Sequence, residues 1–194
     1  MAARPAVFID RDGTLTDEVG YVNHPRRLRL LPRSAEAIRR LNAAGIPAVV
    51  ATNQAGVARG YFSESVLHAV NDELACQLKD AGAKLDGVYV CSHHPTAGAP
   101  PYRAECDCRK PKAGLLERAA RELGLDLASS TMIGDKASDL EAGRAAGTRA
   151  VLVLTGYGLG DWEYQREVFR VPPDYVADDL LAAVDWILEH PVAA

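Results

Sequence analysis

Short apolar runs alternate along the chain with longer stretches in which apolar residues recur every three or four positions. The short runs predict buried strands, and the longer stretches predict amphipathic helices, because residues three or four apart share one face of a helix. Alternation of the two favours βαβ units around a parallel sheet. Strands are predicted at residues 6–9, 48–51, 87–91, 131–133 and 150–154.

Helices are predicted between and after these strands, each with a start or stop signal. Ser34 is expected to cap the first helix, which stops at Gly45, and the second begins near Ser63. A third carries a stripe of leucine and alanine residues and ends at Gly124. The last two are predicted at about residues 138–146, before Gly147, and behind a cap at Asp178.

The length and composition of the chain predict one domain. A chain of 194 residues, 48% of them hydrophobic, can bury one sizeable core, so a single domain over residues 1–194 is expected. About forty positions separate Asp12 from Thr52, and a helix and a strand occupy part of them. This leaves no room for a large cap domain there, and the site should be open. Long loops are predicted at residues 16–33, 92–112 and 155–174.

A glycine-rich run, Gly156-Tyr157-Gly158-Leu159-Gly160, follows the last of these predicted strands. A dinucleotide fingerprint needs its third glycine three residues after the second, and a P-loop ends in Gly-Lys-Ser or Gly-Lys-Thr. The run fits neither pattern, so we predict a mobile loop there.

The charge pattern narrows the class of partner. The formal net charge of −4 is mild and both signs are mixed along the chain, which argues against binding to nucleic acid or to an anionic membrane. No apolar run approaches the 18 residues of a membrane span, and the first residues lack the pattern of a secretory signal. We expect a soluble cytoplasmic monomer that acts on a small molecule.

The first strand ends in two carboxylates two residues apart, Asp10 and Asp12, followed by Gly13. At the end of a buried strand, one acid can attack phosphorus while the other protonates the leaving oxygen and later activates water. The alternative is that Asp12-Gly13 forms only a turn and Asp10 is only a loop residue, which is the commoner meaning of an isolated pair.

Polar residues also follow the other predicted strands. The carboxyl ends of parallel strands meet at one edge of a sheet, so Thr52, Lys110 and Asp135 are expected near the acid pair. A hydroxyl can donate to phosphate oxygens, a fixed cation stabilises a transferring phosphoryl group, and a third carboxylate can bind Mg²⁺. Each residue alone would be ordinary turn chemistry or surface charge. Together they predict a magnesium-dependent phosphoryl-transfer site.

Three cysteines and a histidine lie close together in the chain, at Cys91, His93, Cys106 and Cys108. Three thiolates and one imidazole suit tetrahedral zinc, and a full set of four protein ligands indicates a structural site. Residues i and i+2 of an extended segment share a side, which favours His93 over the neighbouring His94. The alternative is a group of reduced cysteines beside a loop histidine. The sequence therefore predicts a zinc-stapled loop at about residues 91–108.

In order, the motifs resemble those of the haloacid-dehalogenase-like phosphatases: Asp10-Arg11-Asp12-Gly13-Thr14, Thr52-Asn53, Lys110-Pro111, and Gly134-Asp135 with Asp139. The resemblance implies an α/β fold with a Rossmann-like, doubly wound parallel sheet. It also implies that Asp10 is the nucleophile and forms an aspartyl-phosphate, and that Asp12 is the general acid and base. Thr52 and Lys110 would hold the transferred phosphoryl group, and Mg²⁺ would be bound by Asp10, the backbone carbonyl of Asp12, and Asp135.

The cysteine-containing loop runs directly into Arg109 and Lys110, a combination that resembles the D-glycero-D-manno-heptose-1,7-bisphosphate 7-phosphatases and the related histidinol-phosphatases. Gly20-Tyr21-Val22, residues 52–60 and His93-His94-Pro95 favour the heptose branch, and the resemblance covers about residues 6–155. By this resemblance Arg109 would recognise the second phosphate of the substrate. The implied substrate-binding residues are Arg11, Glu18, Val19, Gly20, Tyr21, Thr52, Asn53, Gln54, Ala55, Arg109, Lys110 and Lys136.

The sequence thus favours a magnesium-dependent phosphatase with structural zinc that hydrolyses the 7-phosphate of a heptose 1,7-bisphosphate. The nearest alternative is a histidinol-phosphate phosphatase or another small phosphomonoesterase, and a phosphotransferase is a third. A zinc-binding interaction module is the non-enzymatic alternative. The intact set of Asp10, Asp12, Lys110 and Asp135 argues against it, because a binding module would not need them.

Overall fold

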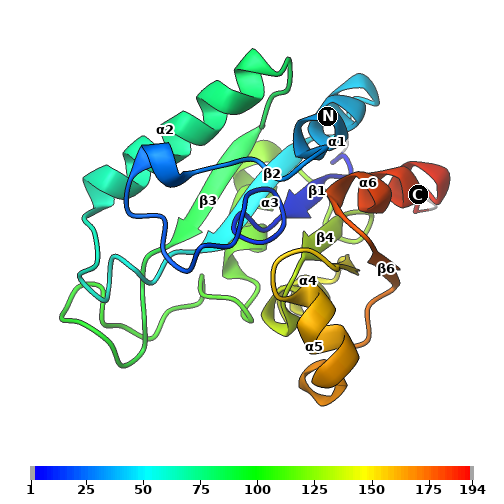
Figure 1. The fold of residues 1–194 in the computed structure, drawn as a ribbon. Helices are drawn as coiled ribbons and strands as arrows, with labels where there is room; N and C mark the ends of the chain where they lie inside the picture. Colours follow the sequence, from blue (N-terminus) through cyan, green and yellow to red (C-terminus); the bar gives the residue numbers. More distant parts are fainter. Residues whose placement is uncertain (1–2, 193–194) are drawn as a thin grey trace.

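The computed structural model describes residues 3–192, and over this range the chain forms a six-stranded parallel sheet with helices on both faces (Figure 1). The spatial order of the strands is β3-β2-β1-β4-β5-β6. The predicted doubly wound α/β fold is therefore confirmed. The strands are β1 (Val7–Ile9), β2 (Ala48–Asn53), β3 (Gly87–Cys91), β4 (Thr131–Gly134), β5 (Arg149–Val153) and β6 (Tyr175–Ala177).

The sheet separates two apolar layers, because successive side chains of a strand point to opposite faces. The helices are α1 (Ser34–Ala43), α2 (Glu64–Asp80), α3 (Gly114–Leu123), α4 (Ala137–Ala146), α5 (Gly158–Tyr164) and α6 (Leu180–Glu189), with 3₁₀ turns η1 (Pro25–Arg27) and η2 (Arg166–Val168). Val7 and Ile9 of β1 pack in one layer with residues of α1, α2 and α6, whereas Phe8 packs in the other layer with residues of α3. Figure 1 shows α1 and α6 side by side on the same face.

Two helix starts differ from the prediction by one residue. Ser34 is the first residue of α1 and not its cap, since the preceding Arg33 takes the cap position at φ 64°. Asp179, and not Asp178, caps α6, because its side chain accepts a hydrogen bond from the N–H of Ala182 at 2.9 Å. Two adjacent acids offer the same local signal, and only the path of the chain selects one of them.

The segment predicted as a long loop at residues 155–174 contains α5 and η2, so both that prediction and the mobile loop at residues 156–160 are wrong. Gly158 is buried at the start of α5, and the ring of Trp162 packs edge-to-face on Phe169 with centroids 5.7 Å apart. These two aromatic residues rest against the buried side chains of Leu140, Ala150 and Leu152. Packing between residues distant in sequence therefore orders a glycine-rich segment that lacks a helical apolar stripe.

No cap domain lies between Asp12 and Thr52, a stretch that the structure describes completely as η1, α1, β2 and their connections. None of the helices within residues 3–192 is both long and apolar enough to cross a membrane.

Candidate active site and metal centre

The ends of β1, β2 and β4 meet at the carboxyl edge of the sheet, because these three strands are neighbours. They bring Asp10 and Thr52 to a small cavity of about 90 Å³. Most of the site residues predicted from the sequence line this cavity. The lining residues are Asp10, Asp12, Glu18, Gly20, Tyr21, Thr52, Asn53, Gln54, Ala55, Lys110, Lys136, Ser138 and Asp139.

A buried lysine links two carboxylates at the bottom of this cavity. Nζ of Lys110 lies 2.9 Å from Oδ1 of Asp10 and 2.6 Å from Oδ1 of Asp139, and it donates to the carbonyl of Ala51 at 2.8 Å. Burial alone would raise the pKa of Asp10, but the Lys110 ammonium, together with Lys136 and a backbone hydrogen bond from Arg11, offsets it and lowers the pKa below its usual value. Burial likewise disfavours charged Lys110, yet the two carboxylates raise its pKa. The opposite charges of Asp10 and Lys110 therefore favour the ionised form of both side chains.

Three buried carboxylates converge beside this lysine: an oxygen from each of Asp10, Asp135 and Asp139 lies within 4.8 Å of the others. Burial, and then the charge of Asp139, raises the pKa of Asp135 to about 8. Oδ1 of Asp135 has no hydrogen-bond partner within residues 3–192. A cluster of buried carboxylate oxygens fits a hard divalent cation such as Mg²⁺, which would offset their repulsion. The sequence reasoning had not included Asp139 among the metal ligands, although its motif contains it.

Asp12 also lines the cavity, and its carboxylate is held from several sides. It accepts hydrogen bonds from Nε2 of Gln54 at 2.7 Å and from Nη2 of Arg11 at 2.8 Å. The side chain of Arg11 is fully buried and also donates to Asn71 at 3.0 Å. The guanidinium of Arg11 is therefore held by Asp12 and Asn71 outside the cavity lining, and substrate binding by Arg11 stays a prediction.

The remaining predicted substrate residues divide between the cavity and its surroundings. Nζ of Lys136 lies 2.9 Å from Oε2 of Glu18 and 4.7 Å from the ring centre of Tyr157. Burial opposes the charge of Lys136, but Asp135 and Glu18 outweigh it and raise the pKa of this lysine. Val19 is 40% exposed and is not part of the cavity lining, unlike its neighbours Glu18 and Gly20.

Arg109 lies in a second hollow of about 340 Å³, which it shares with Lys110 and with residues of the cysteine-containing loop such as Pro95 and Cys106. Its Nη1 donates to the carbonyl of His93 at 3.2 Å. Lys110 borders both hollows, so the predicted second-phosphate residue lies next to the acidic cavity and not within it.

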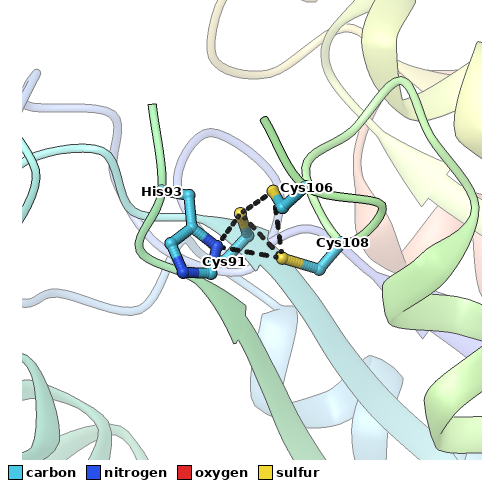
Figure 2. Close-up of side chains that lie close together, drawn as sticks. All are labelled: Cys91, His93, Cys106 and Cys108. Carbon is cyan, nitrogen blue, oxygen red and sulfur yellow. Dashed lines mark hydrogen bonds between the residues drawn. The ribbon is translucent and has the colours of Figure 1, made fainter. Parts of the chain in front are cut away.

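Cys91, the last residue of β3, lies close to His93, Cys106 and Cys108 of the cysteine-containing loop (Figure 2). The sulfur atoms lie 3.1–3.6 Å apart, and Nδ1 of His93 is 3.4 Å from Sγ of Cys108. This three-sulfur, one-nitrogen set suits tetrahedral zinc and leaves no place for a fifth group. His94 instead accepts from the N–H of Ala97 and contacts Arg59, so it belongs to the surrounding loop.

One part of the site was missed from the sequence, the turn directly after β5. The hydroxyl of Thr155 donates to the carbonyl of Gly13 at 2.6 Å, and the N–H of Tyr157 donates to Oδ2 of Asp135 at 2.9 Å. The position of the turn could have indicated its role, because the turn follows β5, which neighbours β4 in the sheet. The glycine-rich run that begins at Gly156 had been interpreted as a mobile loop instead.

Known proteins resemble the chain over nearly its whole length. Residues 107–183 match the family model described as "HAD-hyrolase-like". A Thermosynechococcus vestitus protein named D-glycero-D-manno-heptose-1,7-bisphosphate 7-phosphatase is 45% identical, covering 96% of this chain and 97% of the relative. A Pasteurella multocida D-glycero-beta-D-manno-heptose-1,7-bisphosphate 7-phosphatase is 45% identical over 79% of this chain and 83% of its own length. The crystal structure of D,D-heptose 1.7-bisphosphate phosphatase from B. bronchiseptica, complexed with magnesium and phosphate, superposes with a TM-score of 0.83 at 33% identity, covering 95% of this chain and 98% of that one.

Proposed function

Because the chain belongs to the haloacid-dehalogenase-like D-glycero-D-manno-heptose-1,7-bisphosphate 7-phosphatase family, we propose that it hydrolyses the 7-phosphate of this bisphosphate. The products are heptose 1-phosphate and inorganic phosphate. The observation that carries the proposal is the ionised Asp10–Lys110 pair at the bottom of the cavity, with Asp12 on the same lining. The pair supplies a nucleophile and a fixed cation at one place, as phosphoryl transfer requires.

We propose that Asp10 acts as the nucleophile. A carboxylate oxygen of Asp10 attacks phosphorus while the bond from phosphorus to the sugar oxygen breaks, and Asp12 delivers its proton to that departing oxygen. Lys110 and Thr52 stabilise the charge on the phosphoryl oxygens. The result is an aspartyl-phosphate and a free sugar hydroxyl.

In the second half of the reaction, Asp12 takes a proton from a water molecule, whose oxygen attacks the phosphorus of the aspartyl-phosphate. The bond between phosphorus and Asp10 breaks, which releases inorganic phosphate and restores both carboxyl groups. Gln54 and Arg11 keep Asp12 in place through their hydrogen bonds, so the same side chain can serve both steps.

Two metal ions complete the proposal. Asp10, Asp135 and the backbone carbonyl of Asp12 would hold Mg²⁺, with Asp139 close enough to contribute. When bound, Mg²⁺ supplies positive charge that reduces the repulsion between a carboxylate nucleophile and a phosphate. The Cys91, His93, Cys106 and Cys108 set would hold structural zinc and thereby fix the segment that leads into Arg109 and Lys110.

We propose that Arg109 binds the phosphate that is kept, and that Glu18, Gly20, Tyr21 and Lys136 contact the sugar. The position of Arg109 beside Lys110 supports this, because a bisphosphate must span two neighbouring cationic groups. A guanidinium can bind a phosphate through two parallel hydrogen bonds. Further predicted contacts lie at the end of β2, in Thr52, Asn53, Gln54 and Ala55, and Arg11 and Val19 stay predictions outside the cavity lining.

The test is phosphate release from both synthetic anomers of the heptose bisphosphate, with histidinol phosphate measured alongside. We expect the higher kcat/KM on a heptose bisphosphate, loss of activity with EDTA and recovery with Mg²⁺. Preference for histidinol phosphate would overturn the substrate assignment, and transfer of phosphate to an acceptor without free phosphate would indicate a phosphotransferase. We also propose that the protein is a single-domain cytoplasmic monomer. Size-exclusion chromatography with light scattering tests the oligomeric state.

A further inference from the structure

The turn after β5, residues 155–157, contacts two of the acid-bearing loops of the cavity at once. Thr155 holds the loop after β1 through the Gly13 carbonyl, and the backbone N–H of Tyr157 holds the carboxylate of Asp135 after β4. These loops are more than a hundred residues apart in the sequence. One short turn therefore ties together the segments that carry the nucleophile, the general acid and a metal-binding carboxylate.

The contact is also very close, because Gly156 lies between these segments. A Cβ atom on Gly156 would lie 2.2 Å from Oδ2 of Asp135 and 2.6 Å from the Cα of Gly13. Gly156 also has φ 57°, a conformation that side chains disfavour. No larger residue fits here without displacing the Asp135 carboxylate. The turn packs directly against that carboxylate and limits its position.

The turn also determines which oxygen of Asp135 is available. Tyr157 occupies Oδ2, while Oδ1 has no hydrogen-bond partner in the part of the chain that the structure describes. Asp135 contributes to the group of carboxylate oxygens with Asp10 and Asp139. A carboxylate fixed through one oxygen presents the other in a defined direction, as expected of hydrogen-bonded metal ligands.

We propose that the 155–157 turn is a positioning element for the cation site, and that Thr155 and Gly156 set the affinity for Mg²⁺ without touching the ion or the substrate. The proposal rests on the magnesium-dependent function described above. Loss of an outer hydrogen-bond partner of a metal ligand typically weakens metal binding 10- to 100-fold. Residues 155–157, predicted from the sequence to lie in a long loop, would then have a positioning role.

The central experiment compares two threonine-to-valine substitutions at opposite ends of β5. Thr155→Val keeps the shape of the side chain but removes the donor to Gly13. Thr148→Val is the matched control, because the Thr148 hydroxyl donates to the carbonyl of Arg149 at 2.8 Å, away from the cavity. The Kd for Mg²⁺ is measured without substrate, by isothermal titration calorimetry and by the rise in Tm that Mg²⁺ produces.

Thr155→Val releases the loop that carries Asp10 and Asp12 and does not remove a direct partner of a metal ligand. It is therefore expected to weaken Mg²⁺ binding about tenfold, the lower end of that range, whereas Thr148→Val leaves it unchanged. Thr155→Ser should restore binding to within about twofold of the wild type, because the hydroxyl remains. Gly156→Ala provides a second variant and should weaken binding at least as much, through displacement of Asp135. Saturating Mg²⁺ should bring the kcat of Thr155→Val back toward that of the wild type, which a general loss of structure would not allow.

Equal Mg²⁺ affinity in Thr155→Val and Thr148→Val would overturn the inference, as would a wild-type chain that binds no Mg²⁺. Failure of the proposed phosphatase function can be distinguished from failure of this positioning role. A chain that binds Mg²⁺ in a Thr155-dependent manner but does not hydrolyse the heptose bisphosphate would keep the positioning role and lose only the substrate assignment.

Discussion

The acidic cavity and the cysteine cluster are assembled in opposite ways. The cavity collects residues from Asp10 to Asp139, which lie at the ends of separate strands or in the segments that follow them, and the strands pack between two apolar layers. The cluster collects its four residues from the short stretch between Cys91 and Cys108. Residues 92–107, all of which the structure describes, form no helix or strand of their own. The geometry of the cavity therefore depends on the packing of the whole sheet. The conformation of the loop around the cluster depends on its four metal-binding side chains.

The two regions also differ in what a single substitution should do. In the cavity, buried charges neutralise each other, as Lys110 does between Asp10 and Asp139. A change there alters chemistry while the sheet persists. In the cluster, the loss of one ligand removes the metal that holds the loop, so chemistry changes only through the position of Arg109 and Lys110.

The largest expected effect is that of Asp10→Asn, which removes the proposed nucleophile while keeping the size of the side chain. We expect kcat to fall at least about 10⁴-fold, with an unchanged circular dichroism spectrum and zinc content. Mass spectrometry serves as the control for deamidation back to aspartate. An active variant shown to retain asparagine would refute the covalent mechanism.

Cys106→Ser should have an intermediate effect on activity, and it should change both the cysteine cluster and the acidic cavity. We expect zinc, measured by elemental analysis, to drop well below one ion per chain, and kcat/KM to fall about tenfold or more as the loop loosens. Cys76→Ser is the matched control, because Cys76 is an exposed free thiol outside the cluster. If Cys106→Ser lost zinc but kept full activity, the cluster would not support the active site.

The smallest expected effect is that of Arg109→Ala, and it should depend on the substrate. We expect KM for the bisphosphate to rise about tenfold, with little change for a sugar monophosphate that lacks the second group. Arg121→Ala, on the exposed side of α3, is the control for the loss of a positive charge. An unchanged kcat/KM for the bisphosphate would place the second phosphate elsewhere.

The local pattern was sufficient for the central strands and most helices. Apolar runs next to turn residues located β1 to β5 to within two residues at each end. The segment after β5 was missed for a physical reason. The three-residue β6 is too short to show alternation, and α5 is stabilised by packing of Trp162 on Phe169 more than by an apolar stripe.

Within the site, the residue types were predictable but their division of labour was not. The family resemblance made Arg11 a candidate for substrate binding, whereas its side chain is buried and donates to Asn71, which lies 60 positions away in the sequence. Asp139 belonged to a motif, but its proximity to Lys110 and Asp135 became visible only in three dimensions.

By itself the sequence determined the fold class, the chemical inventory of the cavity and the ligands of the cysteine cluster. The strand-and-helix alternation, the acids at strand ends and the cysteine–histidine set follow from spacing within a strand, a helix or a short loop, where covalent geometry limits the alternatives. The substrate-binding residues came from the family resemblance. The tertiary structure alone decided which oxygen of Asp135 is free, where Arg11 points, and that the turn at residues 155–157 presses against the acids. Those features depend on contacts between segments far apart in the chain, whose positions are set by the packing of the whole sheet.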